Sequence, residues 1–302
     1  MCGINGFIRN TTNIDESLIN IMNKQIIHRG PDDSGVFNEN ISDKHIGLGM
    51  QRLSIIDLDS GQQPIYSKDD NLVVVFNGEI YNFKSLKNEL LKTNQVSFET
   101  TSDTEVILKL YEVHGTKSFE MLDGMFAFTI LDREKNKVYL VRDFFGEKPL
   151  YFTKQPSGVY WASELKSIKE IIPESLSLSQ EAIELFFQLT YIPSPYSIYE
   201  NVFKLLPNHF LKIDIKSNIF NQFEISSSKI EDSKSQMSFE AAKSKTKELV
   251  TQSVFSRCIS DVPLGTFLSG GVDSSIVSSC LANYKETSID TFSMGFEKKS
   301  FD

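Results

Sequence analysis

The sequence predicts a domain of mixed helices and strands, followed by the opening of a second α/β unit. Apolar runs of strand length recur in residues 2–225, and apolar residues with the helical period lie between them. Near the C-terminal end a glycine-rich turn separates a short apolar run from a helix. We therefore expect one domain over 2–225, a linker over 226–238, and the N-terminal part of a second domain over 239–302.

Strands are expected where apolar residues run without interruption. Residues 72–76 form such a run, which is typical of a strand buried on both faces. Asn77-Gly78 follows it directly and has the composition of a two-residue hairpin turn. Further strands are expected at 125–131, 137–141 and 159–162.

Helices are expected where apolar residues recur every three or four positions. Two such faces consist of Phe83, Leu86, Leu90 and Leu91, and of Val106, Ile107, Leu110 and Tyr111. Before the second face, Ser102 and Glu105 have the spacing of a capping box, with Asp103 in the first turn.

The linker at 226–238 is predicted from its Ser, Lys, Asp and Glu content. A helix is expected from Phe239 through Val254, then a strand at 266–268, then a helix carrying Ile276, Val277 and Leu281. This α/β unit reaches the last residue, Asp302, before a doubly wound sheet could close.

Charge and composition limit the classes of binding partner and the cellular location that can be expected. A formal net charge of −9 over 302 residues disfavours nucleic acid, because no basic excess is available for phosphates. Neither a signal peptide nor an apolar run of the ~18–20 residues that span a bilayer is present, so no membrane association is expected. Three widely spaced cysteines (Cys2, Cys258, Cys280) favour a reducing cytoplasm, and the scattered histidines suggest no zinc site.

Cys2 is a candidate nucleophile. Removal of Met1 would place its α-amine beside its sulfur, so that one residue supplies both nucleophile and base. Taken alone, a cysteine at position 2 is more simply incidental. The same holds for Asn77 and Gly78 as oxyanion donors, for Asp103 as an ammonium ligand and for Arg52 as a carboxylate ligand, since each has an ordinary structural explanation.

The segment Ser269-Gly270-Gly271-Val272-Asp273-Ser274-Ser275 is a candidate phosphate loop. Glycines allow close backbone approach, and the helix that follows presents free N–H groups to an anion. Asp273 could bind Mg²⁺. The lysine and spacing of a Walker loop are absent, and a generic glycine turn is the alternative.

Several motifs occur together in a fixed order. They are Cys2-Gly3-Ile4, His28-Arg29-Gly30-Pro31-Asp32, Arg52-Leu53-Ser54-Ile55-Ile56-Asp57, Asn77-Gly78-Glu79-Ile80-Tyr81-Asn82, Ser102-Asp103-Thr104-Glu105 and Arg142-Asp143-Phe144-Phe145-Gly146-Glu147-Lys148-Pro149-Leu150-Tyr151. This series closely resembles the class II glutamine amidotransferases, specifically the glutamine-dependent asparagine synthetases, over residues 2–302.

The resemblance implies an α+β fold, a four-layer α/β/β/α sandwich of the N-terminal-nucleophile class, followed by an ATP-pyrophosphatase (PP-loop) domain. Cys2 would attack the carboxamide of glutamine, with Asn77 and Gly78 stabilising the oxyanion. The glutamine site would consist of Arg52, Leu53, Ser54, Ile55, Ile56, Asn77, Gly78, Glu79 and Asp103. Relatives commonly carry a histidine where this chain has Met50, a departure that no role above depends on.

In the second domain the resemblance implies ATP as a substrate with Mg²⁺, and no organic cofactor. Its site would consist of Leu268, Ser269, Gly270, Gly271, Asp273, Ser274, Ser275 and Met294. Aspartate would be activated as β-aspartyl-AMP and aminated by ammonia, and a homodimer is conceivable. The rest of this site would lie after Asp302, so we expect a fragment or a truncated product that is not a competent synthetase.

Three alternatives remain open at this stage. One is a related amidotransferase with another carboxylate acceptor, such as a sugar carboxylate. Another is a glutamine-binding sensor without synthetase activity, although binding alone would not need the sulfur of Cys2. The third, an N-terminal-nucleophile hydrolase acting on another amide, leaves the glycine loop unexplained.

Overall fold

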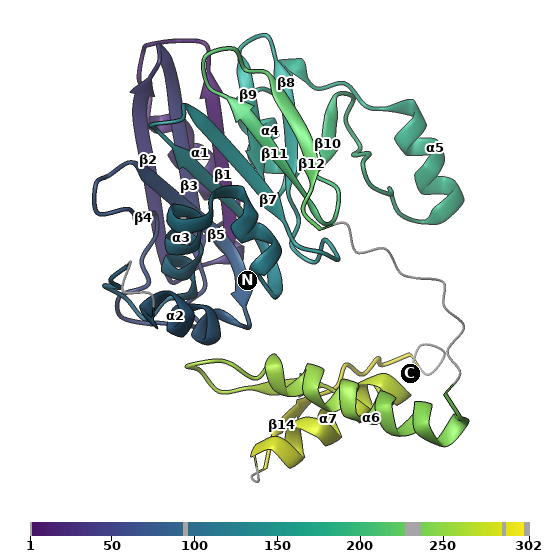
Figure 1. The fold of residues 1–302 in the computed structure, drawn as a ribbon. Helices are drawn as coiled ribbons and strands as arrows, with labels where there is room; N and C mark the ends of the chain where they lie inside the picture. The colour runs from purple at the N-terminus through teal and green to yellow at the C-terminus, as the bar shows by residue number, and fades with distance from the viewer. Residues whose placement is uncertain (1, 93–95, 227–236, 286–287, 299–302) are drawn as a thin grey trace. The chain divides into compact units, whose positions relative to one another are not determined.

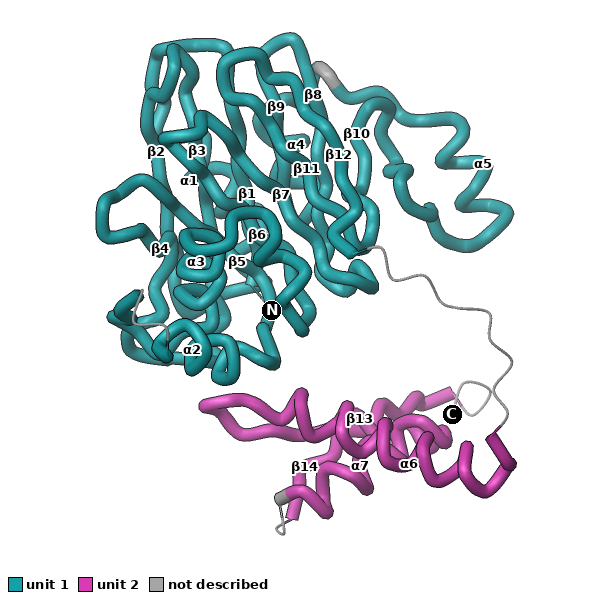
Figure 2. Tube along the Cα trace, viewed as in Figure 1, with its two compact units in different colours: residues 1–227 teal, residues 228–302 magenta. Residues whose placement is uncertain are grey.

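The computed structural model describes residues 2–92, 96–226, 237–285 and 288–298. The chain divides into two compact units, residues 1–227 and 228–302 (Figure 2). Most of the expected linker falls on residues 227–236, which lie outside the described residues.

Two antiparallel six-stranded sheets form the first unit (Figure 1). The first sheet has the order β10 (Val202–Lys204), β8 (Tyr151–Gln155), β9 (Gly158–Ala162), β1 (Gly3–Arg9), β3 (Lys44–Arg52), β2 (Asp33–Ile41). The second has the order β12 (Phe220–Glu224), β11 (His209–Asp214), β7 (Lys137–Arg142), β6 (Gly124–Asp132), β5 (Leu72–Ile80), β4 (Ile65–Tyr66).

The sheets enclose the main core between them, and helices cover their outer faces. Trp161 of β9 donates from Nε1 to Thr129 Oγ1 of β6 at 3.0 Å, which links the two sheets. Helices α1 (Glu16–Lys24) and α4 (Leu165–Ile171) pack on the first sheet, where Ile19 and Ile168 join one apolar cluster. Helix α3 (Asp103–His114) lies on the second sheet, where its Tyr111 lies 5.5 Å from Tyr139 of β7, ring centre to ring centre. Helix α2 (Phe83–Lys92) packs against α3. The predicted four-layer sandwich is confirmed.

The remaining elements of the first unit connect or extend these layers. They are the 3₁₀ turns η1 (Ile27–Arg29), η2 (Gly115–Met121) and η3 (Pro173–Ser175), and helix α5 (Gln180–Leu189).

The hairpin turn predicted at Asn77-Gly78 is wrong. Strand β5 continues through both residues to Ile80 and pairs with β6, with Gly78 opposite Phe126. Glycine is required there because a Cβ would lie 2.1 Å from the carbonyl oxygen of Met125. The preceding run is buried on both faces because α3 covers one and the first sheet covers the other.

Other differences also have a packing cause. Leu91 was expected on the buried face of α2 but is 42% exposed. Strands β1, β2 and β3 were not predicted, because glycines interrupt their apolar pattern where a neighbour fills the space. At Gly47, for example, a Cβ would lie 2.4 Å from the ring of Phe7.

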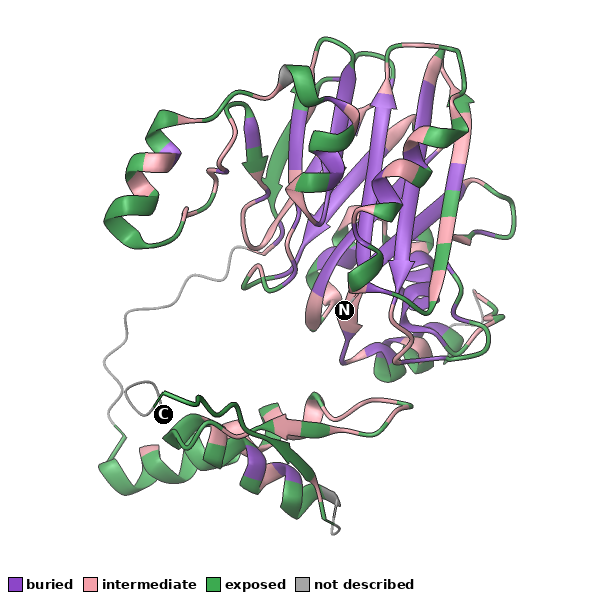
Figure 3. Ribbon diagram, turned by 180° about the vertical axis from the view of Figure 1, so that it is seen from behind, coloured by how far each residue is buried: buried purple, intermediate pink, exposed green. Residues whose placement is uncertain are grey.

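The second unit is a strand–helix–strand element preceded by a helix. It contains α6 (Phe239–Ser256), β13 (Gly265–Phe267), α7 (Val272–Lys285) and β14 (Asp290–Phe292), and β13 pairs with β14 in parallel. Among its described residues only Ser278 and Leu281 are buried, whereas the strands of the first unit are largely buried (Figure 3). The predicted helix that carries Ile276 and Val277 is α7, and these two side chains are 44% and 41% exposed.

Within the described ranges, every helix falls short of the length or the apolar character that crossing a bilayer requires.

Candidate active site

Cys2 lies immediately before β1, with its sulfur against the loop that follows β3. The Leu53 N–H donates to Cys2 Sγ at 3.3 Å, and the thiol lies 3.5 Å from the Leu53 carbonyl oxygen. Burial raises the pKa of the Cys2 thiol; the Leu53 hydrogen bond opposes this, and the nearby Glu79 adds to it. The thiol is therefore protonated near neutral pH and needs a base. Met1 lies outside the described residues, so its removal stays a prediction.

A small cavity opens beside the sulfur. It is lined by Cys2, Arg52, Leu53, Ile55, Ile56, Gln63, Phe76, Gly78, Glu79, Ser102, Asp103 and Thr104. Most residues expected to bind glutamine thus meet at one place. Ser54 and Asn77 are not part of this lining, and the Ser54 N–H instead donates to Asp32 Oδ2 at 2.9 Å.

The open edge of β5 presents a backbone donor to this cavity. Phe126 uses its N–H and carbonyl on Asp143, so Gly78, which lies opposite Phe126, points its own N–H away from β6. On that edge the Phe76 N–H donates to Gln63 Oε1 at 2.7 Å. The Ile80 N–H donates to Asp103 at 3.0 Å. The Gly78 N–H lies between these two occupied donors.

The Asn77 side chain lies on the face of β5 that is turned towards the first sheet, the face that also carries Glu79. By strand alternation it shares that face with Val73 and Val75, which belong to the core between the sheets. Its side chain is 0% exposed, and among the described residues neither its Oδ1 nor its Nδ2 has a hydrogen-bond partner. A buried amide without partners is uncommon and can donate to a ligand at the end of the strand.

Arg52, the last residue of β3, is 5% exposed. Its Nη2 donates to the carbonyl oxygens of Ile56 at 3.0 Å and Asp57 at 2.6 Å, which fixes the loop that contacts Cys2. Burial opposes ionisation of Asp57, but hydrogen bonds from Ser60 and Thr101 outweigh it and hold its pKa below the usual value.

Two carboxyl groups, the half-buried Glu79 and the buried Asp103, line the same cavity as this arginine. Burial, and next the charge of Asp103, raise the pKa of Glu79 to about 8. Burial also raises the pKa of Asp103 to about 6, against hydrogen bonds from the Ile80 and Thr104 N–H groups. The two carboxyl groups resist being ionised at the same time. An added cation, such as the ammonium of an amino acid, favours their ionised forms.

Helix α3 places Asp103 at its first position. Ser102 is the N-cap, as predicted, and accepts from the Thr104 N–H at 3.1 Å. The reciprocal half of the expected capping box is wrong. Glu105 accepts from the Thr100 N–H at 2.7 Å and from the Glu99 N–H at 3.0 Å, rather than from Ser102.

Arg29 and Glu164 were not predicted as site residues. Arg29 donates from Nε to the Cys2 carbonyl oxygen at 2.8 Å and from Nη1 to Glu164 at 3.0 Å. Burial disfavours the Glu164 carboxylate, but hydrogen bonds from Arg29, Lys166 and His28 prevail and lower its pKa. Arg29 belongs to a motif noted in the sequence, whereas Glu164 is distant in sequence and carried no signal.

Lys148 was also missed, although it lies in a noted motif. Its side chain is 3% exposed. Burial lowers the pKa of Lys148, while the charges of Glu79 and Cys2 oppose that shift. It is therefore a buried lysine whose charge acts on Glu79 and on the candidate nucleophile.

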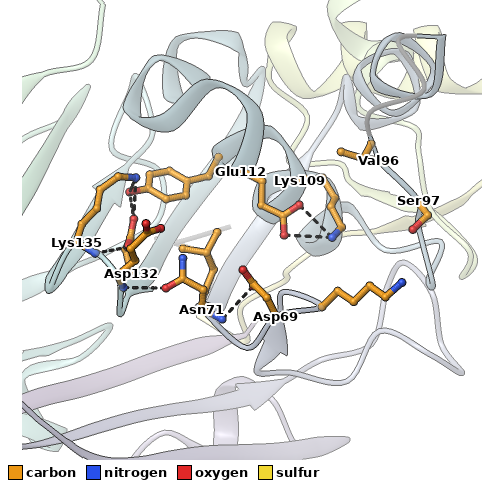
Figure 4. A pocket seen from close by; sticks show the side chains of 12 residues that line it. Asp69, Asn71, Val96, Ser97, Lys109, Glu112, Asp132 and Lys135 are labelled. Atoms are coloured by element: carbon orange, nitrogen blue, oxygen red, sulfur yellow. Dashed lines mark hydrogen bonds and ion pairs between the residues drawn. The ribbon is translucent and has the colours of Figure 1, made fainter.

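A second, polar pocket of about 560 Å³ lies near Leu72, at the other end of β5 (Figure 4). Lys109 pairs with Glu112 at 3.1 Å and Lys135 pairs with Asp132 at 2.9 Å on its wall. These charges satisfy one another, and none of the predicted site residues lies here.

In the second unit the glycine loop joins β13 to α7. Gly270 has φ +81°, a conformation that favours glycine. Ser274 and Ser275 both donate to the Gly271 carbonyl oxygen, at 3.1 and 2.8 Å. Ser269 Oγ lies 3.1 Å from Ser274 Oγ, so the serine hydroxyls are gathered at the start of the helix.

The other residues expected at this second site flank the loop. The Leu268 N–H donates to the Phe292 carbonyl oxygen at 2.8 Å. Met294, two residues after Phe292, is 81% exposed. Asp273 lies in the first turn of α7. No group of three or more His, Cys, Asp or Glu residues that could hold a metal occurs in the described part of the chain.

Comparison with known proteins matches this arrangement. Residues 1–224 match the family described as glutamine amidotransferase domain, and residues 245–302 match asparagine synthase. A putative glutamine-hydrolysing asparagine synthetase 2 of Methanocaldococcus jannaschii is 40% identical over 99% of this chain and 60% of the relative. Asparagine synthetase 1 of Bacillus subtilis is 36% identical over 100% of this chain and 47% of the relative. The chain thus spans about half of the curated relatives that it matches.

Solved structures support the fold. Glutamine phosphoribosylpyrophosphate amidotransferase from B. subtilis matches with a TM-score of 0.54 at 16% identity, over 96% of this chain and 65% of that one. An allosteric regulatory enzyme of purine biosynthesis matches with a TM-score of 0.55, also at 16% identity, over 96% and 64%. With a family match over residues 1–224 and the fold expected for it, this chain belongs to the glutamine amidotransferase family.

Proposed function

We propose that this chain is the glutamine-hydrolysing domain of an asparagine synthetase, with the opening of its ATP-using domain. One observation carries the proposal: Cys2 shares a small cavity with the buried guanidinium of Arg52, the buried carboxyl group of Asp103 and the half-buried carboxyl group of Glu79. These are the complementary charges for the α-carboxylate and α-ammonium of an amino acid, placed next to a nucleophile.

In the proposed reaction the Cys2 sulfur attacks the side-chain carboxamide carbon of glutamine. The α-amine freed by removal of Met1 takes the thiol proton and passes it to the leaving ammonia. The Asn77 amide and the Gly78 N–H donate to the tetrahedral oxyanion. A γ-glutamyl thioester remains, and water hydrolyses it to glutamate.

Arg29 supports this chemistry without touching the substrate. Its hydrogen bond to the Cys2 carbonyl holds the backbone of the nucleophile, and Glu164 holds Arg29 in turn. Arg52 would bind the substrate carboxylate, and its hydrogen bonds to Ile56 and Asp57 fix the loop lining the same cavity.

The proposed second reaction uses the glycine loop. The N–H groups at the start of α7 and the hydroxyls of Ser269, Ser274 and Ser275 are suited to the pyrophosphate of ATP. A single carboxylate, Asp273, fits a Mg²⁺ ion that phosphate oxygens and water would otherwise coordinate, and this ion would offset phosphate charge. Aspartate, activated as β-aspartyl-AMP, would accept the ammonia.

The proposal includes a cytoplasmic, reducing environment, which the three free cysteines favour, and a homodimer as the assembly to test by size-exclusion chromatography.

Glutamate release from glutamine by the purified chain, without ATP or aspartate, tests the proposed first reaction. We expect turnover by the parent from which Met1 has been removed, and none by Cys2→Ala. A folded, Met1-free parent that binds glutamine without hydrolysing it would support a sensor instead. The acceptor is tested on the full-length protein by product analysis with aspartate and with sugar carboxylates.

A further inference from the structure

Lys148 is a buried cation that the proposed reaction does not use. An ammonium that is only 3% exposed has lost most of its hydration, which is costly unless an opposite charge lies close by. The groups whose charge favours its ionised form are Glu79 first and Cys2 next. The charges that favour its ionised form therefore belong to the candidate active site.

The backbone fixes Lys148 next to the strand that carries Glu79. The Asp143 carboxylate accepts from the Lys148 N–H at 3.0 Å and from the Phe126 N–H at 3.2 Å. Phe126 lies opposite Gly78 in the β5–β6 pair. Lys148 and Glu79 are thus attached to neighbouring points of one strand pair.

The carbonyl side of Lys148 is held as well. Arg142 donates from Nε to the Lys148 carbonyl oxygen at 2.7 Å and from Nη2 to the Gly146 carbonyl oxygen at 2.6 Å. With both backbone groups bonded, the loop holds the main chain of Lys148 in place.

The charges around this ammonium come from several elements. Glu79, Cys2, Arg29 and Glu147 act on Lys148, whereas Asp103, Lys148 and Arg52 act on Glu79. One like charge, that of Asp103, and two cations, Lys148 and Arg52, therefore act on Glu79. We propose that Lys148 is a positioning residue for glutamine recognition: its ammonium favours the ionised form of Glu79, which is the form that binds the α-ammonium of the substrate.

This inference rests on the proposed function, which assigns Glu79 to the substrate ammonium. Without Lys148, Glu79 beside Asp103 keeps its proton to a higher pH, and a neutral carboxyl group binds an ammonium poorly. Glutamine should then bind less tightly. Glutaramate, which has the carboxamide and the carboxylate of glutamine but no amino group, should bind as before.

The test measures binding by calorimetry in a Cys2→Ala background, so that it does not depend on turnover. Lys148→Met should raise the Kd for glutamine about tenfold at pH 7, the effect of a one-unit change in a carboxyl pKa. The loss should shrink as the pH rises past the Glu79 pKa, and Lys148→Arg should restore binding. The Kd for glutaramate should stay unchanged.

Lys109→Met is the matched control. It removes a buried lysine that pairs with Glu112 in the distant polar pocket, and we expect no change in the Kd for glutamine (Figure 4). Equal losses for glutamine and glutaramate, a loss independent of pH, or no rescue by arginine would overturn the role of Lys148. If Cys2→Ala protein binds glutamine but the parent does not hydrolyse it, the proposed hydrolysis is overturned and the proposed role of Lys148 is not. Failure of Cys2→Ala to bind glutamine would overturn both.

Discussion

Asn77→Ala should separate catalysis from stability. The Asn77 amide is 0% exposed and lacks a hydrogen-bond partner among the described residues. The free-energy cost of burying this amide is therefore not offset by a hydrogen bond. A buried polar group left unpaired costs about 1–3 kcal/mol. Removing it offsets the packing lost with the side chain, and we expect the free energy of unfolding to stay within about 1 kcal/mol of the parent.

Catalysis should respond differently, because the amide is proposed to donate to the oxyanion. Loss of one such donor typically lowers kcat by about 10²–10³, or about 2.7–4 kcal/mol. Glutamate release under saturating glutamine measures kcat, and urea denaturation of the same preparations measures stability.

Asn82→Ala provides the contrast. Its Nδ2 donates to the Met121 carbonyl oxygen at 2.8 Å, and its Oδ1 accepts from the Asp123 N–H at 3.0 Å. This substitution should cost about 1–3 kcal/mol of stability, since it removes two hydrogen bonds to the backbone that contribute about 0.5–1.5 kcal/mol each. If Asn77→Ala lost as much stability as Asn82→Ala, or kept the parent kcat, the reasoning about Asn77 would be refuted.

The remaining predictions concern pH and the strand pair. Glu164 has a lowered folded-state pKa, because hydrogen bonds outweigh burial; its stabilisation is present above the ordinary pKa of 4.5 and is lost as the pH falls through the folded value. Urea denaturation from pH 7 to pH 3 should therefore show the gap between parent and Glu164→Gln closing in acid, and a constant gap would contradict this. Glu79 has the opposite sign: burial and Asp103 raise its pKa to about 8, so its contribution to stability falls as the pH rises from 4.5 towards 8. Glu79→Gln should gain stability relative to the parent above that range while binding glutamine less tightly, and parallel pH curves would exclude the mechanism. Gly78→Ala should lower the melting temperature sharply, because its Cβ would meet the Met125 carbonyl oxygen at 2.1 Å; an unchanged melting temperature would show that β5 and β6 can separate cheaply.

The predictable part of the fold is the part that local pattern determines. The apolar runs at 72–76, 125–131 and 137–141 lie inside β5, β6 and β7, because strands buried on both faces need such runs. Asn77-Gly78 shows the limit. Its composition favours a turn, but antiparallel pairing with β6 overrides this preference, and the glycine is needed for close approach to Met125 instead.

The candidate site divides in a similar way. Cys2, Arg52 and Asp103 belong to motifs that can be found along the chain. Glu164 lies 135 positions from Arg29, and only the folding of both segments against Cys2 brings it into the site. No local pattern encodes such a pair.

Which charged side chains are buried is the property that is hardest to predict from the sequence, and Glu147 and Lys148 illustrate why. They are adjacent, and Asp143 accepts from both of their N–H groups, at 2.8 and 3.0 Å. The same loop nevertheless leaves Glu147 exposed and buries Lys148. Composition counts Glu147 and Lys148 as a pair of opposite charges. The charge of Lys148 nevertheless acts more strongly on the cavity, because water screens the exposed Glu147. The contribution of Lys148 to the charge balance around Glu79 therefore follows from the path of this one loop.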